Sequence, residues 1–343
     1  MTTAPRRVHN PPNPWASAHV DWLEEPPPVA LEVFEEEART IVVANDSPDV
    51  GFDFGVNPYR GCQHACAYCY ARPTHQYLGL GAGTDFDVRI VAKRNAPTLL
   101  RRELASRRWA SGRPPLAFSG VTDCYQPLEA SYALTRRCLE VCDAFRHPVA
   151  VITKSALVRR DAELLAGMSR RGGAHVTLSI PFAEDEDARR IEPFASAAST
   201  RFETLRRLAE AGVPVGVAIA PLIPGLNDWQ VPEILARARA AGATSAFLTL
   251  LRLPAEVATV FEDRLRGAYP ERATKVLNAL RDMRGGALHR ARFGERMRGE
   301  GPRWDVVRQL FRVHCQRLGL GSEARFGTGA ERAPSRQLGL FES

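Results

Sequence analysis

The sequence has 343 residues, 45% of them hydrophobic and 25% charged, which is ordinary for a globular protein with a sizeable core. No apolar run in the sequence approaches the ~20 residues that a membrane-spanning helix needs, so we expect no membrane-spanning segment. Residues 1–7 lead into Pro-rich polar sequence, without the apolar core of a signal peptide. Three of the seven cysteines are clustered and four are scattered. That pattern is typical of a reducing compartment, so we expect a cytoplasmic chain.

The chain begins with a predicted irregular N-terminal arm over residues 1–50, containing one short acidic helix near residues 31–39. Over residues 51–252, short apolar runs alternate with amphipathic segments. Strands are expected at residues 54–58, 87–91, 116–119, 149–153, 174–180, 215–220 and 245–251. Helices are expected at residues 69–76, 96–108, 131–145, 161–171, 199–211 and 229–241. Continuous apolar strands separated by helices indicate an α/β fold with a parallel barrel or part-barrel.

The alternation stops after residue 252, and residues 253–320 are predicted to form an Arg-rich helical extension. Its helices are expected near residues 256–266, 271–284 and 304–318, followed by a flexible tail over residues 321–343. The net charge of the chain is +7, and residues 281–317 hold ten arginines against four acids. Clustered arginine is typical of proteins that bind polyanions, but a solvated helix face has the same composition. Both interpretations stay open.

Three cysteines follow the first strand of the alternating region, at the spacing Cys-x3-Cys-x2-Cys: Cys62, Cys66 and Cys69. Thiolates are ligands that suit iron–sulfur clusters and zinc. Three thiolates leave one iron of a four-iron cluster open to bind a small molecule. A structural zinc site would need a fourth ligand, which His64 could supply. Three buried structural thiols are the third alternative.

The motif resembles that of radical S-adenosylmethionine (SAM) enzymes, including the aromatic Tyr68 directly before the third cysteine. Its flanks, Asn-Pro-Tyr-x-Gly-Cys at residues 57–62 and Tyr-Cys-Tyr-Ala at residues 68–71, resemble the branch related to spore photoproduct lyase. The resemblance implies a partial (β/α)6 parallel barrel and a [4Fe-4S] cluster held by the three cysteines. It further implies reductive cleavage of SAM to a 5′-deoxyadenosyl radical, with an electron donor such as a flavodoxin or ferredoxin.

The resemblance also implies cofactor contacts just after several strands, where active sites on such folds gather. Thr122 and Asp123 match the region that holds the amino group of SAM, although a helix N-cap is the alternative. Lys154, in Thr-Lys-Ser, matches a contact to the SAM carboxylate, with a surface lysine as the alternative. The remaining cofactor-binding candidates carried over from the family are Tyr68, Ser179, Arg190 and Pro221.

The hydrogen-atom donor of the lyase branch has no counterpart at the matching position. That donor is a cysteine two residues before the Ser-Asp pair, and the equivalent residue here is Gly120. Spore-photoproduct repair itself is therefore in doubt. Cys124 and Tyr125, which follow Asp123, are alternative catalytic candidates.

The predicted partner is nucleic acid, most concretely damaged DNA in a repair reaction, because the lyase-like motif and the Arg-rich segment coincide in one chain. Gln337, Leu338, Leu340 and Phe341 resemble a peptide that docks on the replication sliding clamp; packing against the chain's own domain is the alternative. Two other functions stay open: modification of a protein or small molecule, and a non-catalytic iron–sulfur sensor that binds DNA. No membrane partner is expected.

Overall fold

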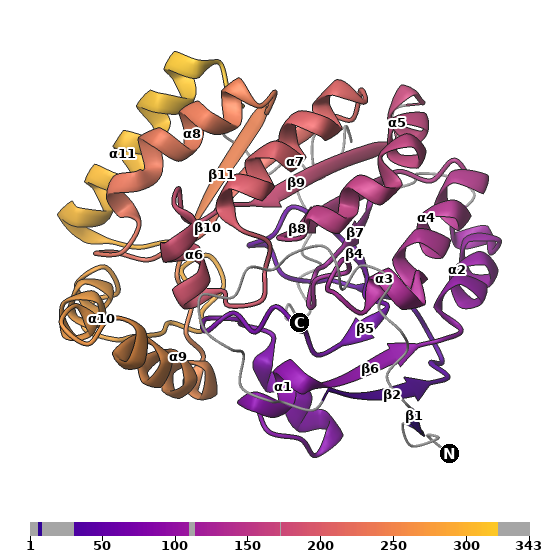
Figure 1. The fold of residues 1–343 in the computed structure, drawn as a ribbon, viewed down its shortest axis with the longest axis horizontal. Coiled ribbons are helices and arrows are strands. Elements are labelled where there is room, and N and C mark those ends of the chain that lie inside the picture. Colours follow the sequence, from indigo (N-terminus) through magenta and orange to yellow (C-terminus); the bar gives the residue numbers. More distant parts are fainter. Residues whose placement is uncertain (1–5, 9–30, 110–113, 172, 322–343) are drawn as a thin grey trace, which may run out of the picture.

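The computed structural model describes residues 6–8, 31–109, 114–171 and 173–321. Its main feature is a seven-stranded sheet in the order β11–β10–β9–β8–β7–β4–β3 (Figure 1). Neighbouring strands run parallel except for the antiparallel edge pair β3–β4. The strands are β3 Val42–Ala44, β4 Phe54–Val56, β7 Leu116–Phe118, β8 Val149–Thr153, β9 Ala174–Ser179, β10 Val215–Leu222 and β11 Ser245–Leu250. The predicted parallel part-barrel is confirmed.

Helices connect these strands and cover the outside of the sheet (Figure 1). They are α2 Ala96–Leu104, α3 Glu129–Tyr132, α4 Leu134–Ala144, α5 Ala162–Arg170, α6 Asp185–Ile191, α7 Ala198–Glu210 and α8 Val231–Ala240. Shorter 3-10 turns are η1 Arg72–Leu78, η2 Arg107–Trp109, η3 Ala156–Asp161 and η4 Asp228–Gln230. Apolar residues of strands and helices form one continuous core, in which Phe118, Val151 and Leu178 are almost fully buried. Burial on both faces explains the continuous apolar runs.

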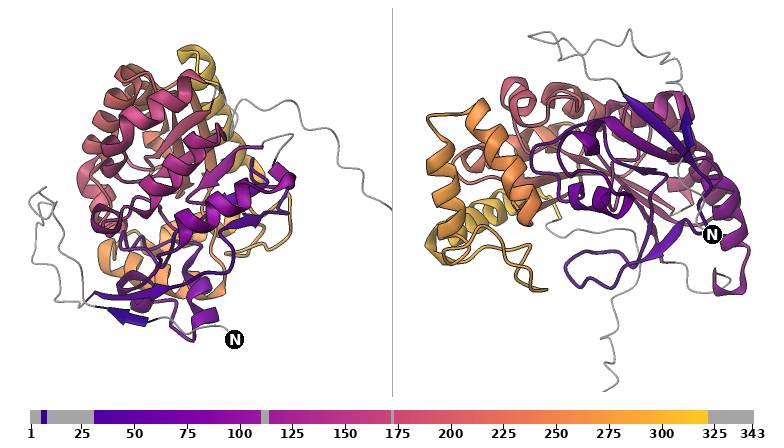
Figure 2. Two further views of the ribbon diagram at one scale, coloured as in Figure 1. Left: turned by 90° about the vertical axis from the view of Figure 1, so that its right-hand side faces the viewer. Right: turned by 90° about the horizontal axis from the view of Figure 1, so that it is seen from below.

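A second, four-stranded sheet in the order β1–β2–β6–β5 lies beside the larger one (Figure 1). Its strands, near the indigo end of the colour range, are seen from two further sides in Figure 2. Its strands are β1 Arg6–Val8, β2 Glu32–Glu36, β5 Tyr59–Arg60 and β6 Arg89–Lys93, with the short helix α1 Thr84–Val88 before β6. The strand expected at residues 87–91 therefore begins two residues later and belongs to this sheet.

The prediction of an acidic helix near residues 31–39 is wrong, because this segment contains strand β2. Val33 is fully buried between neighbouring strands, while the acids lie beside arginines of other segments. Glu36 pairs with Arg60 at 3.1 Å and Glu35 with Arg94 at 2.8 Å. Cross-strand and adjacent ion pairs of this kind let an acid-rich segment adopt a strand.

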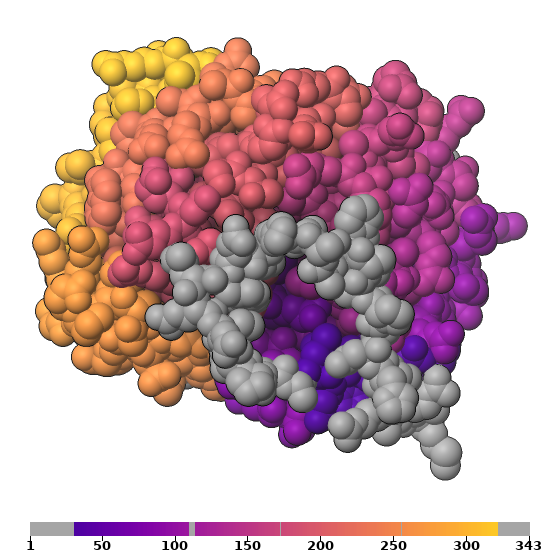
Figure 3. Space-filling view, in the orientation of Figure 1, coloured from indigo at the N-terminus to yellow at the C-terminus, as the bar shows by residue number. Residues whose placement is uncertain are grey.

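The C-terminal helices α9 Ala255–Ala268, α10 Ala273–Asp282 and α11 Gly301–Leu318 gather along one edge of the molecule (Figure 3). Helix α11 packs on α8, and the segment of residues 283–300 connects α10 to α11. After α11, the oxygen of Gly321 accepts a bond of 2.7 Å from the amide of Ala246, beside the edge strand β11. Among the described residues, no helix combines the length and apolar character that crossing a membrane requires. The clamp-like residues 337–341 lie outside the described residues, and docking stays a prediction.

Candidate active site

The cysteine loop leaves β4 and enters a tight path at Gly61. Gly61 has φ of 78°, and a Cβ there would lie 2.8 Å from Cε1 of His75 and 2.9 Å from Cδ1 of Ile90. Only glycine satisfies both the left-handed backbone and the close packing. The next amide, of Cys62, donates to the carbonyl of Phe86 at 2.9 Å, which ties the loop to α1.

Two arginines hold the backbone of this loop from behind. Buried Arg72 donates to the carbonyl of Cys66 at 2.8 Å and pairs with Asp87, also at 2.8 Å. Arg264 of α9 donates to the carbonyl of Ala65 and to Asp87, each at 2.6 Å. Residues far apart in the sequence therefore fix the peptide units between the cysteines.

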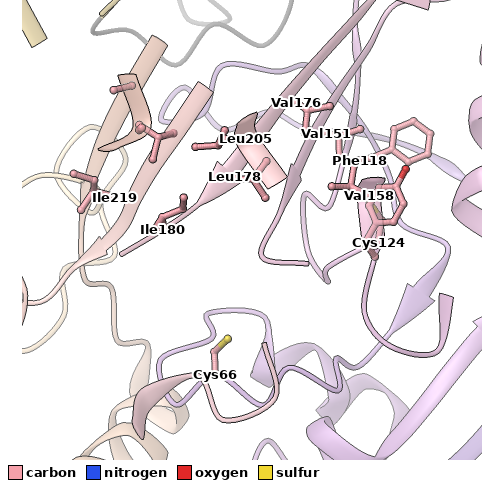
Figure 4. Packing of buried hydrophobic residues seen from close by; sticks show 14 of the residues in the cluster. Cys66, Phe118, Cys124, Val151, Val158, Val176, Leu178, Ile180, Leu205 and Ile219 are labelled. Carbon is pink, nitrogen blue, oxygen red and sulfur yellow. The ribbon is translucent and has the colours of Figure 1, made fainter. Parts of the chain in front are cut away.

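Cys62, Cys66 and Cys69 line one cavity of about 450 Å³ at the carboxyl ends of the strands. Figure 4 shows Cys66 on its loop, across from Ile219 of β10 and from Ile180, which directly follows β9. Burial raises the pKa of all three thiols, so their thiolates need a cationic group beside them. Within the described ranges, no three Cys, His, Asp or Glu side chains converge on a position for one metal ion. Thiols that each reach a different iron of one cluster fit this arrangement.

Asp123 lies in the same cavity, after β7, and links it to the end of β8. Its carboxylate accepts bonds from the hydroxyl of Thr153 at 2.7 Å, the amide of Lys154 at 2.8 Å and the amide of Tyr125 at 2.9 Å. Nδ1 of His64 lies 3.4 Å from Oδ2 of Asp123. Burial alone would raise the pKa of Asp123, but His64 and these donors lower it to about 2. The carboxylate is therefore ionised at neutral pH, facing the cavity.

Lys154 lines the same cavity and is surrounded by polar and charged side chains. Its Nζ donates to Oγ of Ser179 at 2.8 Å and lies 5.6 Å from the ring centre of Tyr68. Nζ also lies 3.9 Å from buried Glu192, which accepts a hydrogen bond from the Tyr68 hydroxyl and pairs with buried Arg201. Burial lowers the pKa of the Lys154 ammonium group. Tyr68, Lys154 and Ser179, three predicted cofactor-binding residues, thus meet in one place.

Sequence reasoning missed Glu192 and Arg201. The family resemblance points to the segment around residue 190 through Arg190 instead. Arg190 is exposed, pairs with Glu186 and lies over the Tyr269 ring at 5.1 Å. Arg190 does not line the cavity. Glu192 follows the last turn of α6 and points to the interior, and its position just after apolar Ile191 was the available signal.

Of the other predicted contacts, Pro221 lines the cavity and Thr122 does not. The Thr122 side chain is buried and donates to the carbonyl of Tyr59 at 2.9 Å. Its hydroxyl thus holds the loop after β7 to β5.

The catalytic candidates Cys124 and Tyr125 are fully buried outside the cavity lining. Figure 4 shows Cys124 beside Phe118 and Val158 in the core. The Tyr125 hydroxyl donates to Asp161 at 3.0 Å. Gly120, where the lyase branch has its donor cysteine, does line the cavity, and its carbonyl accepts a bond of 2.6 Å from the Tyr70 hydroxyl.

The N-terminal and C-terminal segments of the described chain meet at this cavity. Its lining includes Asn45, Ser47 and residues 49–52 from one segment, and Leu251, Arg252, Arg296 and Met297 from the other. Nε of Arg296 donates to Asp49 at 2.6 Å, and the amide of Gly294 donates to the other oxygen of Asp49, also at 2.6 Å. The arm and the C-terminal extension therefore build part of the site, which sequence patterns did not indicate.

Comparison with known families decides what this arrangement is. The family model of the radical SAM superfamily matches residues 56–238. This chain belongs to the radical SAM superfamily. The superfamily uses a [4Fe-4S] cluster and SAM. This favours the cluster interpretation of the three cysteines over zinc, and their role as its ligands stays a prediction.

Related sequences come from distant organisms. An uncharacterised protein of Mycobacterium tuberculosis is 36% identical over 222 residues, which are 64% of this chain and 65% of that protein. The chain thus matches just under two thirds of the length of this relative. An uncharacterised protein of Methanocaldococcus jannaschii is 31% identical over 58% of this chain and 70% of its own length.

Solved structures of spore photoproduct lyase share the fold. One mutant of that enzyme has a TM-score of 0.61 at 16% identity, covering 84% of this chain and 81% of the lyase. The lyase complexed with dinucleoside spore photoproduct has a TM-score of 0.60 over the same shares.

Proposed function

We propose that this radical SAM enzyme acts on nucleic acid, in a lyase-like reaction on a damaged or modified base in DNA. The observation that carries the proposal is one cavity in which the three cysteines, the ionised Asp123 and Lys154 converge, with arginines at its rim. The shared fold with a lyase that binds a dinucleoside photoproduct supports the substrate class. A cytoplasmic location, a role in DNA repair and reduction by a flavodoxin or ferredoxin belong to the same proposal.

The cysteines, Asp123 and Lys154 would each have a separate task in this cavity. Cys62, Cys66 and Cys69 would hold the cluster, which together with SAM supplies a radical that abstracts a hydrogen atom. Asp123 accepts three hydrogen bonds from the chain and has His64 beside Oδ2, and its negative charge at the cavity wall would attract the ammonium group of SAM. Lys154 would pair with a carboxylate as a compact cation, oriented by Ser179 and Tyr68.

The chain also shields the reaction and limits the choice of hydrogen donor. Residues 49–52 and 296–297 line part of the cavity and would limit the access of water to a reactive intermediate. Because Cys124 and Tyr125 lie outside the lining, their proposed donor role would require the loop after β7 to rearrange. We therefore propose a reaction that differs from spore-photoproduct repair in its final hydrogen transfer.

The first test is anaerobic. The chain is reconstituted with iron and sulfide, reduced, mixed with SAM and assayed for 5′-deoxyadenosine, with Cys66→Ala alongside. Product from the unaltered chain alone is expected, followed by substrate-dependent product with damaged DNA. An intact cluster that yields no 5′-deoxyadenosine would contradict the enzymatic proposal and favour an iron–sulfur sensor. Product formation that no nucleic acid alters, while a protein or small molecule does, would contradict the substrate class.

A further inference from the structure

Basic side chains gather at the end of β11, beside the cavity. Arg252 follows β11, Arg284 follows α10, and His289 and Arg296 belong to the segment of residues 283–300. Nη2 of Arg284 lies 3.1 Å from the carbonyl of Arg296. Burial and the positive charges of Arg252, Arg284 and Arg296 lower the pKa of His289. They derive from parts of the chain that the family motif does not include.

Several of their nitrogen atoms are buried without a hydrogen-bond partner among the described residues. They are Nε of Arg252, Nε and Nη1 of Arg284, and Nδ1 of His289. Arg284 is only 1% exposed. A buried donor that makes no hydrogen bond costs free energy, and a buried unpaired cation costs more. This concentration of unsatisfied donors indicates a site prepared for a ligand that brings acceptors.

Carboxylates neutralise the charge of neighbouring arginines, but none pairs with Arg252 or Arg284 among the described residues. Arg296 pairs with Asp49 at 2.6 Å, and Arg290 pairs with Glu300. In the part of the chain that the structure describes, no carboxylate lies within ion-pair distance of Arg252 or Arg284. The missing counter-charge is negative, so the ligand is an anion.

The cluster is placed to act on a molecule in the cavity. Arg252 and Arg296 line it directly. Nη2 of Arg284 donates to the carbonyls of Leu251 at 2.7 Å and Arg296 at 3.1 Å, which holds both lining segments together. Tyr70, 48% exposed, lines the same cavity and offers an aromatic face to a base.

We propose that Arg252, with Arg284 and His289 behind it, forms a phosphate site at the rim of the cavity, which binds a backbone phosphate of a nucleic-acid substrate. The assignment rests on the proposed substrate class. Guanidinium groups suit phosphate because they present several N–H donors in a fixed plane. The site would fix the register of the strand, so that one base reaches the cavity.

The test is an equilibrium titration with a short fluorescein-labelled single-stranded DNA, at several salt concentrations, without SAM or reductant. Arg252→Gln should weaken binding about tenfold, as expected for a lost hydrogen bond to a charged group. It should also lower the slope of log K against log salt by ~0.7, the value for one phosphate contact to a single strand. Arg284→Lys, which keeps the charge and removes the planar donors, should weaken binding if it folds. Arg308→Gln, at an exposed position of α11, is the matched control.

The outcomes separate this site from the catalytic proposal. Equal binding and equal salt slope in the unaltered chain and Arg252→Gln would overturn the phosphate site, whatever the result of the SAM assay. The same loss in Arg308→Gln would overturn it too, because the effect would then be nonspecific charge. Inorganic phosphate, titrated as a competitor, should displace the DNA. If the chain bound inorganic phosphate through Arg252 but did not bind DNA, the proposal that the phosphate belongs to a nucleic acid would be overturned.

Discussion

Asp123 combines a structural and a binding task in one carboxylate. Thr153, Lys154 and Tyr125 donate to it, so its negative charge organises the loop after β7 and the end of β8. The same carboxylate lines the cavity, with Nδ1 of His64 3.4 Å from its Oδ2. Substituting this residue should therefore change both the stability and the binding of SAM.

Asp123→Asn should raise the KM for SAM in 5′-deoxyadenosine formation by about 10- to 100-fold, the effect of losing a hydrogen bond to a charged group. Initial rates against SAM concentration, with cluster content equalised, measure this change. Asp305→Asn, on the exposed face of α11, serves as the control. An unchanged KM in Asp123→Asn would show that this carboxylate does not contact SAM.

The acid stability of the chain should depend on Asp123. Its pKa is about 2 when folded, against 3.8 for an unperturbed aspartate, so the group stabilises the fold above about pH 4. This contribution, about 2 kcal/mol, is lost as pH falls through the folded pKa. The free energy of unfolding of Asp123→Asn, measured by denaturant titration, should therefore fall less steeply between pH 4 and 2 than that of the unaltered chain. Parallel pH dependences would contradict the depressed pKa.

His289 reports on the phosphate site. Burial and three arginines lower its pKa, so the neutral ring is favoured in the free chain. An anion bound among these groups would favour the protonated ring and raise the pKa. An NMR titration of the imidazole, with and without DNA, should show this upward shift, and Arg252→Gln should reduce it.

At the scale of elements, the sequence pattern predicted what packing demands. The six parallel strands appear as apolar runs because both their faces are buried, and Val149–Thr153 matches the prediction to the residue. Strand β2 escaped prediction because Glu35 and Glu36 pair with arginines of other segments. Local composition cannot reveal partners so far along the chain.

The residues of the candidate site also fall into those that the sequence pattern predicts and those that it misses. Cys62, Asp123 and Lys154 follow strands directly, so the fold class predicts their place. Arg252 and Arg296 reach the cavity through the C-terminal extension, whose position depends on tertiary packing alone. The sequence therefore predicts the residues at the strand ends and misses those that other segments bring to the rim.

Helix α9 should contribute to cluster retention through Arg264. Its bonds to Ala65 and Asp87 hold the cysteine loop, so Arg264→Gln should destabilise the loop by about 1–3 kcal/mol. Iron and sulfide content after reconstitution, and the rate of iron loss to a chelator, measure the effect. Arg266→Gln on the same helix, exposed and paired with Glu262, should retain iron like the unaltered chain. Equal iron loss in the two variants would contradict a specific role for Arg264.

At the scale of the whole molecule, the cavity is bordered by segments that lie far apart in the sequence. The contact between Asp49 and Arg296 joins residues that are 247 positions apart. These segments should protect an oxygen-sensitive cluster, since they limit access to the three thiols.

Asp49→Asn should weaken this contact by about 1–3 kcal/mol and accelerate the loss of cluster absorbance in air. The expected change is in the decay rate, with little change in the initial iron content. Asp46→Asn, an exposed neighbour, is the control. A decay rate equal to that of the control would show that the contact does not protect the cluster.

The reach of Arg264 to the cysteine loop also sets an order of assembly during synthesis. The carbonyl of Ala65 and the guanidinium that holds it are 199 residues apart. A ribosome therefore releases all three thiols long before α9 exists to fix their backbone, and the rim arginines emerge later still. Cluster insertion into a rigid site must follow translation of most of the chain. A nascent or truncated chain would present the three thiols on an unsupported loop, open to oxidation and to stray metal ions.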